Sequence, residues 1–192
     1  KGTTASPEPS KNLSNKELAA MAKKDAEESR QEALALSADS KSAMDAGASL
    51  NSQAAKKNLD AEKLREQNPT AADSLQKVAE EDASMATRIL ALGNALSDDA
   101  RRKEKEADLN TQYSKELEKA ITSKDPKILQ RLSDLQREID AVSKEESRSA
   151  EMLEAIRVTI NESEKSIATT NTGIQELQTS IAELKTTISG KE

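Results

Sequence analysis

Residues 174–188 read IQELQTSIAELKTTI, and the spacing of their apolar side chains indicates the class of fold. The apolar positions alternate by three and four residues; they are Ile174, Leu177, Ile181, Leu184 and Ile188. This spacing places them on one stripe of an α-helix, and such a stripe needs an apolar partner. The partner can lie in the same chain, in a second copy or in another protein, and which it is bears on what the protein does.

The same stripe starts near Ile128 and keeps its three–four alternation up to Ile188. Before residue 174 its members are Ile128, Leu132, Leu135, Ile139, Val142, Glu146, Ser149, Leu153, Ile156, Ile160, Ser163, Ile167 and Thr170. A period of 3.5 residues held this long is typical of left-handed helix packing, because a straight helix would turn its stripe off its partner.

The composition favours helices throughout. The 192 residues include no Phe, no Trp and no Cys, and Tyr113 is the one aromatic residue. A compact domain without aromatic side chains buries little apolar area per residue, whereas helices rich in Ala, Glu, Lys and Leu lose little on ordering. With 5 Gly and 4 Pro, frequent turns are disfavoured as well, so the fold class is all-α.

Three capping patterns divide the chain. Ser14 with Glu17 three residues later forms a capping box, Asn68 precedes Pro69, and Asp125 precedes Pro126. We therefore expect helices over about 15–67, 69–123 and 126–189, in one domain over 14–192, after a disordered leader over residues 1–13.

The first two helices also carry stripes. Most members of the first stripe are Ala, Ser or Gly, and the middle of the second stripe is polar. Small residues let a neighbouring backbone approach closely while burying little area each. A break of the second helix between Gly93 and Ser97 is an open alternative, because Gly93 could end one helix and Ser97 could cap another. We expect the second helix to continue through this point.

The stripes match when neighbouring helices run in opposite directions. Around the second turn the expected pairs are Leu117 with Leu132, Ala107 with Val142, Leu96 with Leu153, Ile89 with Ile160 and Leu75 with Ile174. Around the first turn they are Ala61 with Leu75 and Leu50 with Ala86. The sequence therefore predicts an elongated antiparallel three-helix coiled coil made of long helical hairpins.

One expected pair is charged. Lys103 falls opposite Glu146, and we interpret this as a register pair, because a shift by one heptad would set a charge against an apolar side chain. The alternative is a solvated gap between the two helices.

The third helix outruns its partner, which leaves Ile181, Leu184 and Ile188 uncovered. We expect self-association into a homo-oligomer, or docking of another protein, through the stripe from Ile174 to Ile188. The alternative is that this end packs on the first turn or frays.

No residue pattern indicates catalysis or a cofactor. The chain has no His and no Cys, so the usual general base, thiolate nucleophile and zinc ligands are missing, and successive carboxylates on a helix cannot surround a metal ion. Mixed charges with a net charge of −6 argue against nucleic acid, and no long apolar run predicts a membrane span. We expect no catalytic, cofactor-binding or metal residue and no small-molecule substrate.

These observations predict a non-enzymatic structural protein: a coiled-coil rod acting as a scaffold, a spacer or a protein-binding surface. The alternative, by compositional analogy, is the coiled-coil region of a bacterial secreted or surface protein, such as a secretion-system translocator or a host-directed effector. The compartment stays open, with secretion or the cell envelope favoured over the cytoplasm, and the chain could be a fragment of a longer protein.

Overall fold

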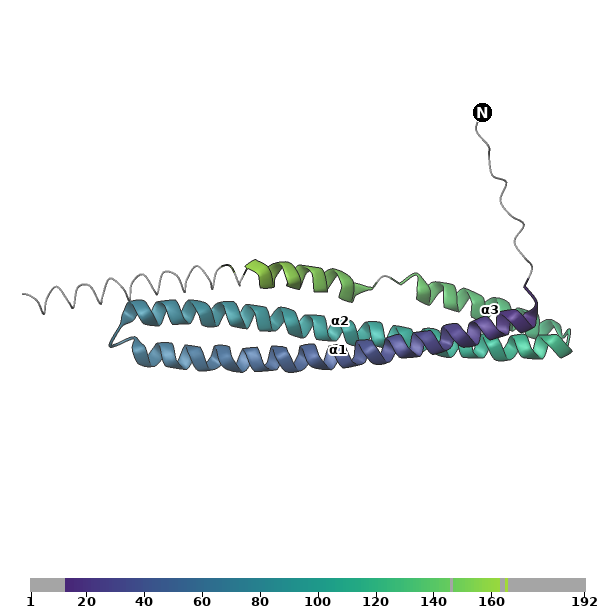
Figure 1. Cartoon of the computed structure of the whole chain (residues 1–192), viewed down its shortest axis with the longest axis horizontal. Helices are drawn as coiled ribbons and strands as arrows, with labels where there is room; N and C mark the ends of the chain where they lie inside the picture. The colour runs from purple at the N-terminus through teal and green to yellow at the C-terminus, as the bar shows by residue number, and fades with distance from the viewer. Residues whose placement is uncertain (1–12, 146, 163–164, 166–192) are drawn as a thin grey trace, which may run out of the picture. The chain divides into compact units, whose positions relative to one another are not determined.

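The computed structural model describes residues 13–145, 147–162 and 165, and its regular structure there is entirely helical. Helix α1 spans Asn15–Leu64, α2 spans Pro69–Thr122 and α3 spans Pro126–Ser143 (Figure 1). Residues 148–162 are helical as well. The all-α prediction is confirmed.

Each of the three helices starts at the cap that the sequence predicts. The Glu17 carboxylate accepts from the Ser14 backbone N–H and hydroxyl at 2.8 Å each, and these bonds lower the pKa of Glu17. The Asn68 side chain accepts from the Ala71 N–H at 3.1 Å. The Asp125 carboxylate accepts from the Lys127 N–H at 2.9 Å. Side-chain acceptors thus satisfy N–H groups that have no partner within the helix.

The described chain forms two compact units, and α1 and α2 contribute to both. The first unit contains the described residues up to Asp39 and those of the segment Leu96–Ser147, which includes all of α3. The second unit contains Ser40–Ala95 and the described residues from Arg148 onward. Helix α2 runs without interruption through residues 93–97, so the expected continuity of this helix is confirmed.

Within each unit α1 and α2 are antiparallel and touch through small residues. Three contacts define the register: the Ser114 hydroxyl donates to the Ala19 carbonyl at 3.0 Å, the Ser40 hydroxyl donates to the Gly93 carbonyl at 2.7 Å, and a Cβ on Gly47 would lie 3.2 Å from the Ala86 carbonyl oxygen. Steps of seven residues from these contacts give pairs of buried small residues. They are Ala19 with Ser114, Ala26 with Ala107 and Ala33 with Ala100 in the first unit, and Ser40 with Gly93, Gly47 with Ala86, Ala54 with Ala79 and Ala61 with Ala72 in the second.

This register corrects the expected pairing by about one helical turn. Ala86 faces Gly47 and not Leu50, and Ala61 falls opposite Ala72 and not Leu75. Pairing small residues with each other brings the two helix backbones close together, whereas a small residue facing Leu would hold them apart. The two helices approach closely at both glycines, because a Cβ at Gly47 or Gly93 would lie 2.8 Å from a side-chain carbon of the opposite helix.

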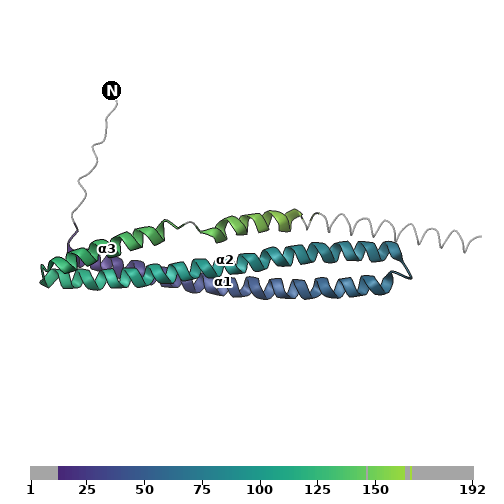
Figure 2. The ribbon, with the colours of Figure 1, turned by 180° about the vertical axis from the view of Figure 1, so that it is seen from behind.

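In the first unit α3 lies beside α2 (Figure 2). The two helices pack through larger side chains. Leu135, Ile139 and Val142 form a buried cluster with Leu109 of α2, and Tyr113 packs against it. Leu135 has no exposed surface. These three α3 residues belong to the predicted stripe, whose burial is confirmed here.

The expected single helix over 126–189 is wrong in one respect. Helix α3 ends at Ser143, where Lys144 forms a C-cap, and the chain is helical again from residue 148. Two residues of the predicted stripe, Leu153 and Ile160, are 51% and 38% exposed, while Ile156 is 7% exposed. The expected burial of Leu153 and Ile160 is therefore not observed.

Candidate functional site

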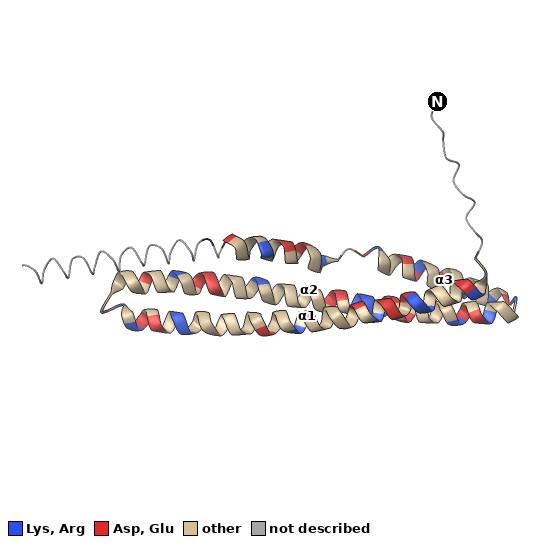
Figure 3. Ribbon diagram, in the orientation of Figure 1, with Lys and Arg blue, Asp and Glu red and all other residues tan. Residues whose placement is uncertain are grey.

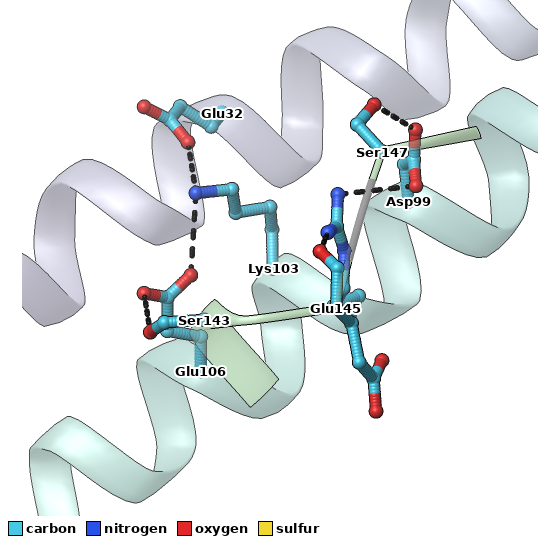
Figure 4. A network of polar contacts seen from close by, with 8 residues as sticks. Glu32, Asp99, Lys103, Glu106, Ser143, Glu145 and Ser147 are labelled. Atoms are coloured by element: carbon cyan, nitrogen blue, oxygen red, sulfur yellow. Dashed lines mark hydrogen bonds and ion pairs between the residues drawn. The ribbon is translucent and has the colours of Figure 1, made fainter. Parts of the chain in front are cut away.

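The first unit contains a polar cluster that links three helices (Figure 4). Lys103 of α2 places its Nζ atom 2.7 Å from the Glu32 carboxylate of α1 and 3.2 Å from that of Glu106 on α2. The Glu106 carboxylate also accepts from the Ser143 hydroxyl of α3 at 3.0 Å. One lysine and two carboxylates therefore connect α1, α2 and the end of α3.

The sequence identifies Lys103 but not these partners. Glu146, its predicted partner, lies outside the described residues, so the predicted pair stays a prediction. Glu32 directly precedes Ala33 of the α1 stripe, and this position beside the stripe is the signal that could have pointed to it. The hydrogen bond to Glu32, followed by that to Glu106, raises the pKa of Lys103 above its usual 10.5.

Replacing Lys103 with Met should lower the free energy of unfolding at neutral pH by about 1 kcal/mol, because Glu106 would lose its cation in a partly buried place. The folded-state pKa is the raised one, so this stabilisation is complete below pH 10.5 and is lost as the pH rises through that raised value. Urea unfolding of the parent protein and of the Lys103→Met variant, at pH 7 and above pH 10.5, measures this difference in the free energy of unfolding. Lys105→Met, at an exposed position of α2, is the control. Equal losses for the two variants would contradict the role of Lys103.

A second cluster lies one helical turn earlier on α2 (Figure 4). Arg102 donates to the Asp99 carboxylate at 3.1 Å, and only 14% and 7% of these side chains are exposed. The other oxygen of Asp99 accepts from the Ser147 hydroxyl at 2.7 Å. Arg102 also donates to the backbone carbonyl of Glu145. The buried ion pair on α2 therefore contacts Glu145 and Ser147, which lie in the non-helical interruption between α3 and the helical residues 148–162.

This cluster was not among the predicted site residues. Asp99 and Arg102 lie beside Leu96, Ala100 and Lys103 of the α2 stripe, and in sequence they resemble the exposed pair Asp98 and Arg101, which has the same spacing. Sequence alone does not distinguish the buried pair from the exposed one. What distinguishes them is the side of α2 on which the end of α3 lies.

The helical residues 148–162 expose an apolar edge. Leu153 and Ile160 are seven residues apart, so they lie on the same side of this helix, and both are more than a third exposed. Beside this segment, in the second unit, an open cleft of about 260 Å³ is lined by Arg88, Ala91, Met152, Ala155 and Ile156. We call Leu153 and Ile160 the apolar edge.

Charged residues of both signs are interspersed along α1 and α2 (Figure 3). An open cleft of about 500 Å³ between α2 and α3 has the same mixed character, with Lys115, Glu116, Lys119 and Arg131 among its lining residues. Among the described residues, no group of His, Cys, Asp and Glu is arranged to hold a metal ion, and no helix there is long and apolar enough to cross a membrane.

The predicted association stripe Ile174, Leu177, Ile181, Leu184 and Ile188 lies outside the described residues. Its expected role therefore stays a prediction, and the apolar edge is the exposed part of the same heptad series among the described residues. Comparisons with protein-family models, with curated proteins and with solved structures find no match to this chain.

Proposed function

We propose that this chain is a non-enzymatic interaction protein, a helical scaffold or spacer that binds a partner protein along its third helical stretch. The observation that supports this proposal is the apolar edge, because Leu153 and Ile160 belong to a regular heptad series and yet are exposed. The series continues in sequence through Ile174 to Ile188, which lengthens the proposed binding surface.

The chemistry of this surface suits an amphipathic helix. Apolar side chains seven residues apart on one helix receive matching side chains from a second helix, as in helix-in-groove recognition. The neighbouring cleft has Ala91, Met152, Ala155 and Ile156 in its walls and can accept one apolar side chain of the partner. Methionine adapts its shape readily, which helps a surface to accept such a side chain.

The α1–α2 pairing supports a scaffold role. In each unit these helices meet through small residues that are buried in every layer, so their backbones pack closely over many turns. Close-packed interiors deform little, and a partner bound to such a support would be held in a defined place.

Photo-crosslinking in the native cells tests the proposal. A photoreactive amino acid at position 153 or 160 should give a covalent adduct with one partner protein, and the same group at exposed position 151 or 162 should not. Leu153→Ser should abolish the adduct formed from position 160. Absence of adducts from both apolar positions, or equal adducts from all four, would contradict the proposal.

Truncation after Thr179 distinguishes a second copy from another partner. If the partner is a second copy, removing Ile181, Leu184 and Ile188 should halve the mass measured by light scattering, because the remaining apolar series is too short to hold two chains together. A mass equal to one chain before and after truncation would rule out self-association and leave a different protein as the partner. The alternative of a secreted or surface protein stays a prediction, and fractionation of cells that produce the native protein tests it.

A further inference from the structure

We propose that Asp99 and Arg102 form a clamp that keeps the third helical stretch interrupted, and that releasing the clamp joins α3 and residues 148–162 into one helix. The clamp would then control whether the apolar edge is available. This regulatory part rests on the proposed function, whereas the change of secondary structure can be measured without a partner.

Nothing in the local sequence requires an interruption at this place. Residues 143–148 read SKEESR and contain neither Gly nor Pro, and Lys and Glu are good helix formers. The C-cap residue Lys144 keeps a right-handed helical conformation at φ −85° and ψ −12°. No described residue has a positive φ. These observations favour contacts with other parts of the chain as the cause of the interruption.

The clamp supplies these contacts. In a continuous helix the Glu145 carbonyl would accept a hydrogen bond from the backbone N–H four residues later. Here it accepts from the Arg102 guanidinium, which carries a charge and is largely buried. A charge-assisted bond of this kind is about twice as strong as a bond between neutral groups, so it can replace the helical one.

The second half of the clamp acts on the other side of the interruption. Ser147 occupies the position just before the helical residues 148–162, where serine is a favoured N-cap. Its hydroxyl donates to Asp99, which also holds Arg102 in place. The Nε atom of Arg102 is also buried, and it has no hydrogen-bond partner among the described residues.

Joining the helices would change the apolar edge. On one continuous helix, Ile139, Val142, Leu153 and Ile160 belong to a single heptad series and share one stripe. In the interrupted state Ile139 and Val142 are buried while Leu153 and Ile160 are exposed. In a joined helix Leu153 and Ile160 would lie on the same stripe as Ile139 and Val142, which pack against α2, and they would then be less available to a partner.

The double variant Asp99→Leu/Arg102→Met of the full chain tests the clamp. Backbone carbon chemical shifts at Glu145 and Ser147 should change from non-helical to helical values, while those of 126–143 and 148–162 stay helical. The matched control is Asp98→Leu/Arg101→Met, which removes an exposed pair with the same spacing and should leave the shifts of residues 144–147 unchanged. Unchanged shifts in a folded double variant would overturn the proposal.

A proline supplies a second test that does not depend on how well the double variant folds. Arg148 is the first residue of its helical segment, where proline is well tolerated, but in a joined helix proline would remove a hydrogen bond and clash with the preceding turn. Arg148→Pro alone should leave the melting temperature nearly unchanged, and added to the double variant it should restore the non-helical shifts. A large loss of stability from Arg148→Pro alone would show that the helix is already continuous and would overturn the proposal.

The two proposals can fail separately. The backbone carbon shifts can change as expected while crosslinking from position 153 gives no adduct in any variant. That result would support the clamp and contradict the partner surface. Strong crosslinking together with an unchanged interruption in the double variant would support the partner surface and contradict the clamp. With both correct, the double variant should lose most of the adduct formed from position 153.

Discussion

Replacing Leu135 with Ala should lower the free energy of unfolding by about 3 kcal/mol, the largest effect expected for a single apolar side chain here. Leu135 has no exposed surface and lies in the cluster that joins α3 to α2, so its removal leaves a cavity and loses apolar burial. Urea unfolding followed by circular dichroism measures the change. Leu129→Ala is the control, because Leu129 lies on the same helix but is 58% exposed.

The control should lose less than about 1 kcal/mol, since surface substitutions change stability little. Equal losses for the two variants would contradict the packing of α3 on α2, because they would show that Leu135 is no better buried than Leu129. A loss for Leu135→Ala confined to a separate, early transition would show that α3 detaches before α1 and α2 unfold.

Enlarging a small residue in the α1–α2 contact should also lower the free energy of unfolding. Ala54→Leu should lower the free energy of unfolding by about 2 kcal/mol, because added methyl and methylene groups must push two closely packed helices apart. Ala54 is 2% exposed and falls opposite Ala79, which has no exposed surface. Thermal and urea unfolding measure the change.

The neighbouring residue provides a matched control. Ala55 lies on the same helix and is exposed, so Ala55→Leu makes the same chemical change outside the contact and should alter stability by less than about 0.5 kcal/mol. A stabilising Ala54→Leu would mean that the two helices leave room for larger side chains, and the close pairing of small residues would then be wrong.

Much of the fold follows from short-range signals in the sequence. The capping box at Ser14, the cap at Asn68 and the Asp125–Pro126 pair each mark a helix start that the structure shows. Such signals work because they depend on residues two or three positions apart, whose geometry the helix itself sets. The α1 and α2 stripes are predictable for the same reason, since heptad spacing identifies a buried face without any knowledge of what covers it.

The register between helices is harder to predict, because it depends on the path of the turn and on the side chains that face each other. Matching Ala61 with Leu75 is wrong by about one turn, and pairs of small residues are the observed solution. The interruption after Ser143 is missed for a related reason. The local sequence favours helix, and the groups that oppose it, Asp99 and Arg102, are more than forty residues away.

The partners of charged residues are also hard to predict from the sequence. Lys103 lies on a stripe and is therefore identifiable as a partly buried cation, but its partner Glu32 comes from α1, and no local pattern joins the two. Leu153 and Ile160 satisfy the heptad pattern yet remain exposed, which the pattern alone cannot reveal. In both cases the missing information is which helix faces the residue in three dimensions.

Disulfide formation most directly tests the central claim, that α1 and α2 of one chain are antiparallel and paired through their small residues. The chain has no cysteine, so Ala54→Cys/Ala79→Cys introduces a single pair, and the paired Cβ atoms should lie close enough for a disulfide. We expect rapid oxidation within one chain for this pair and little for Ala54→Cys/Ala86→Cys, which is displaced by one heptad. Faster closure of the displaced pair, or crosslinks only between separate chains, would contradict the account.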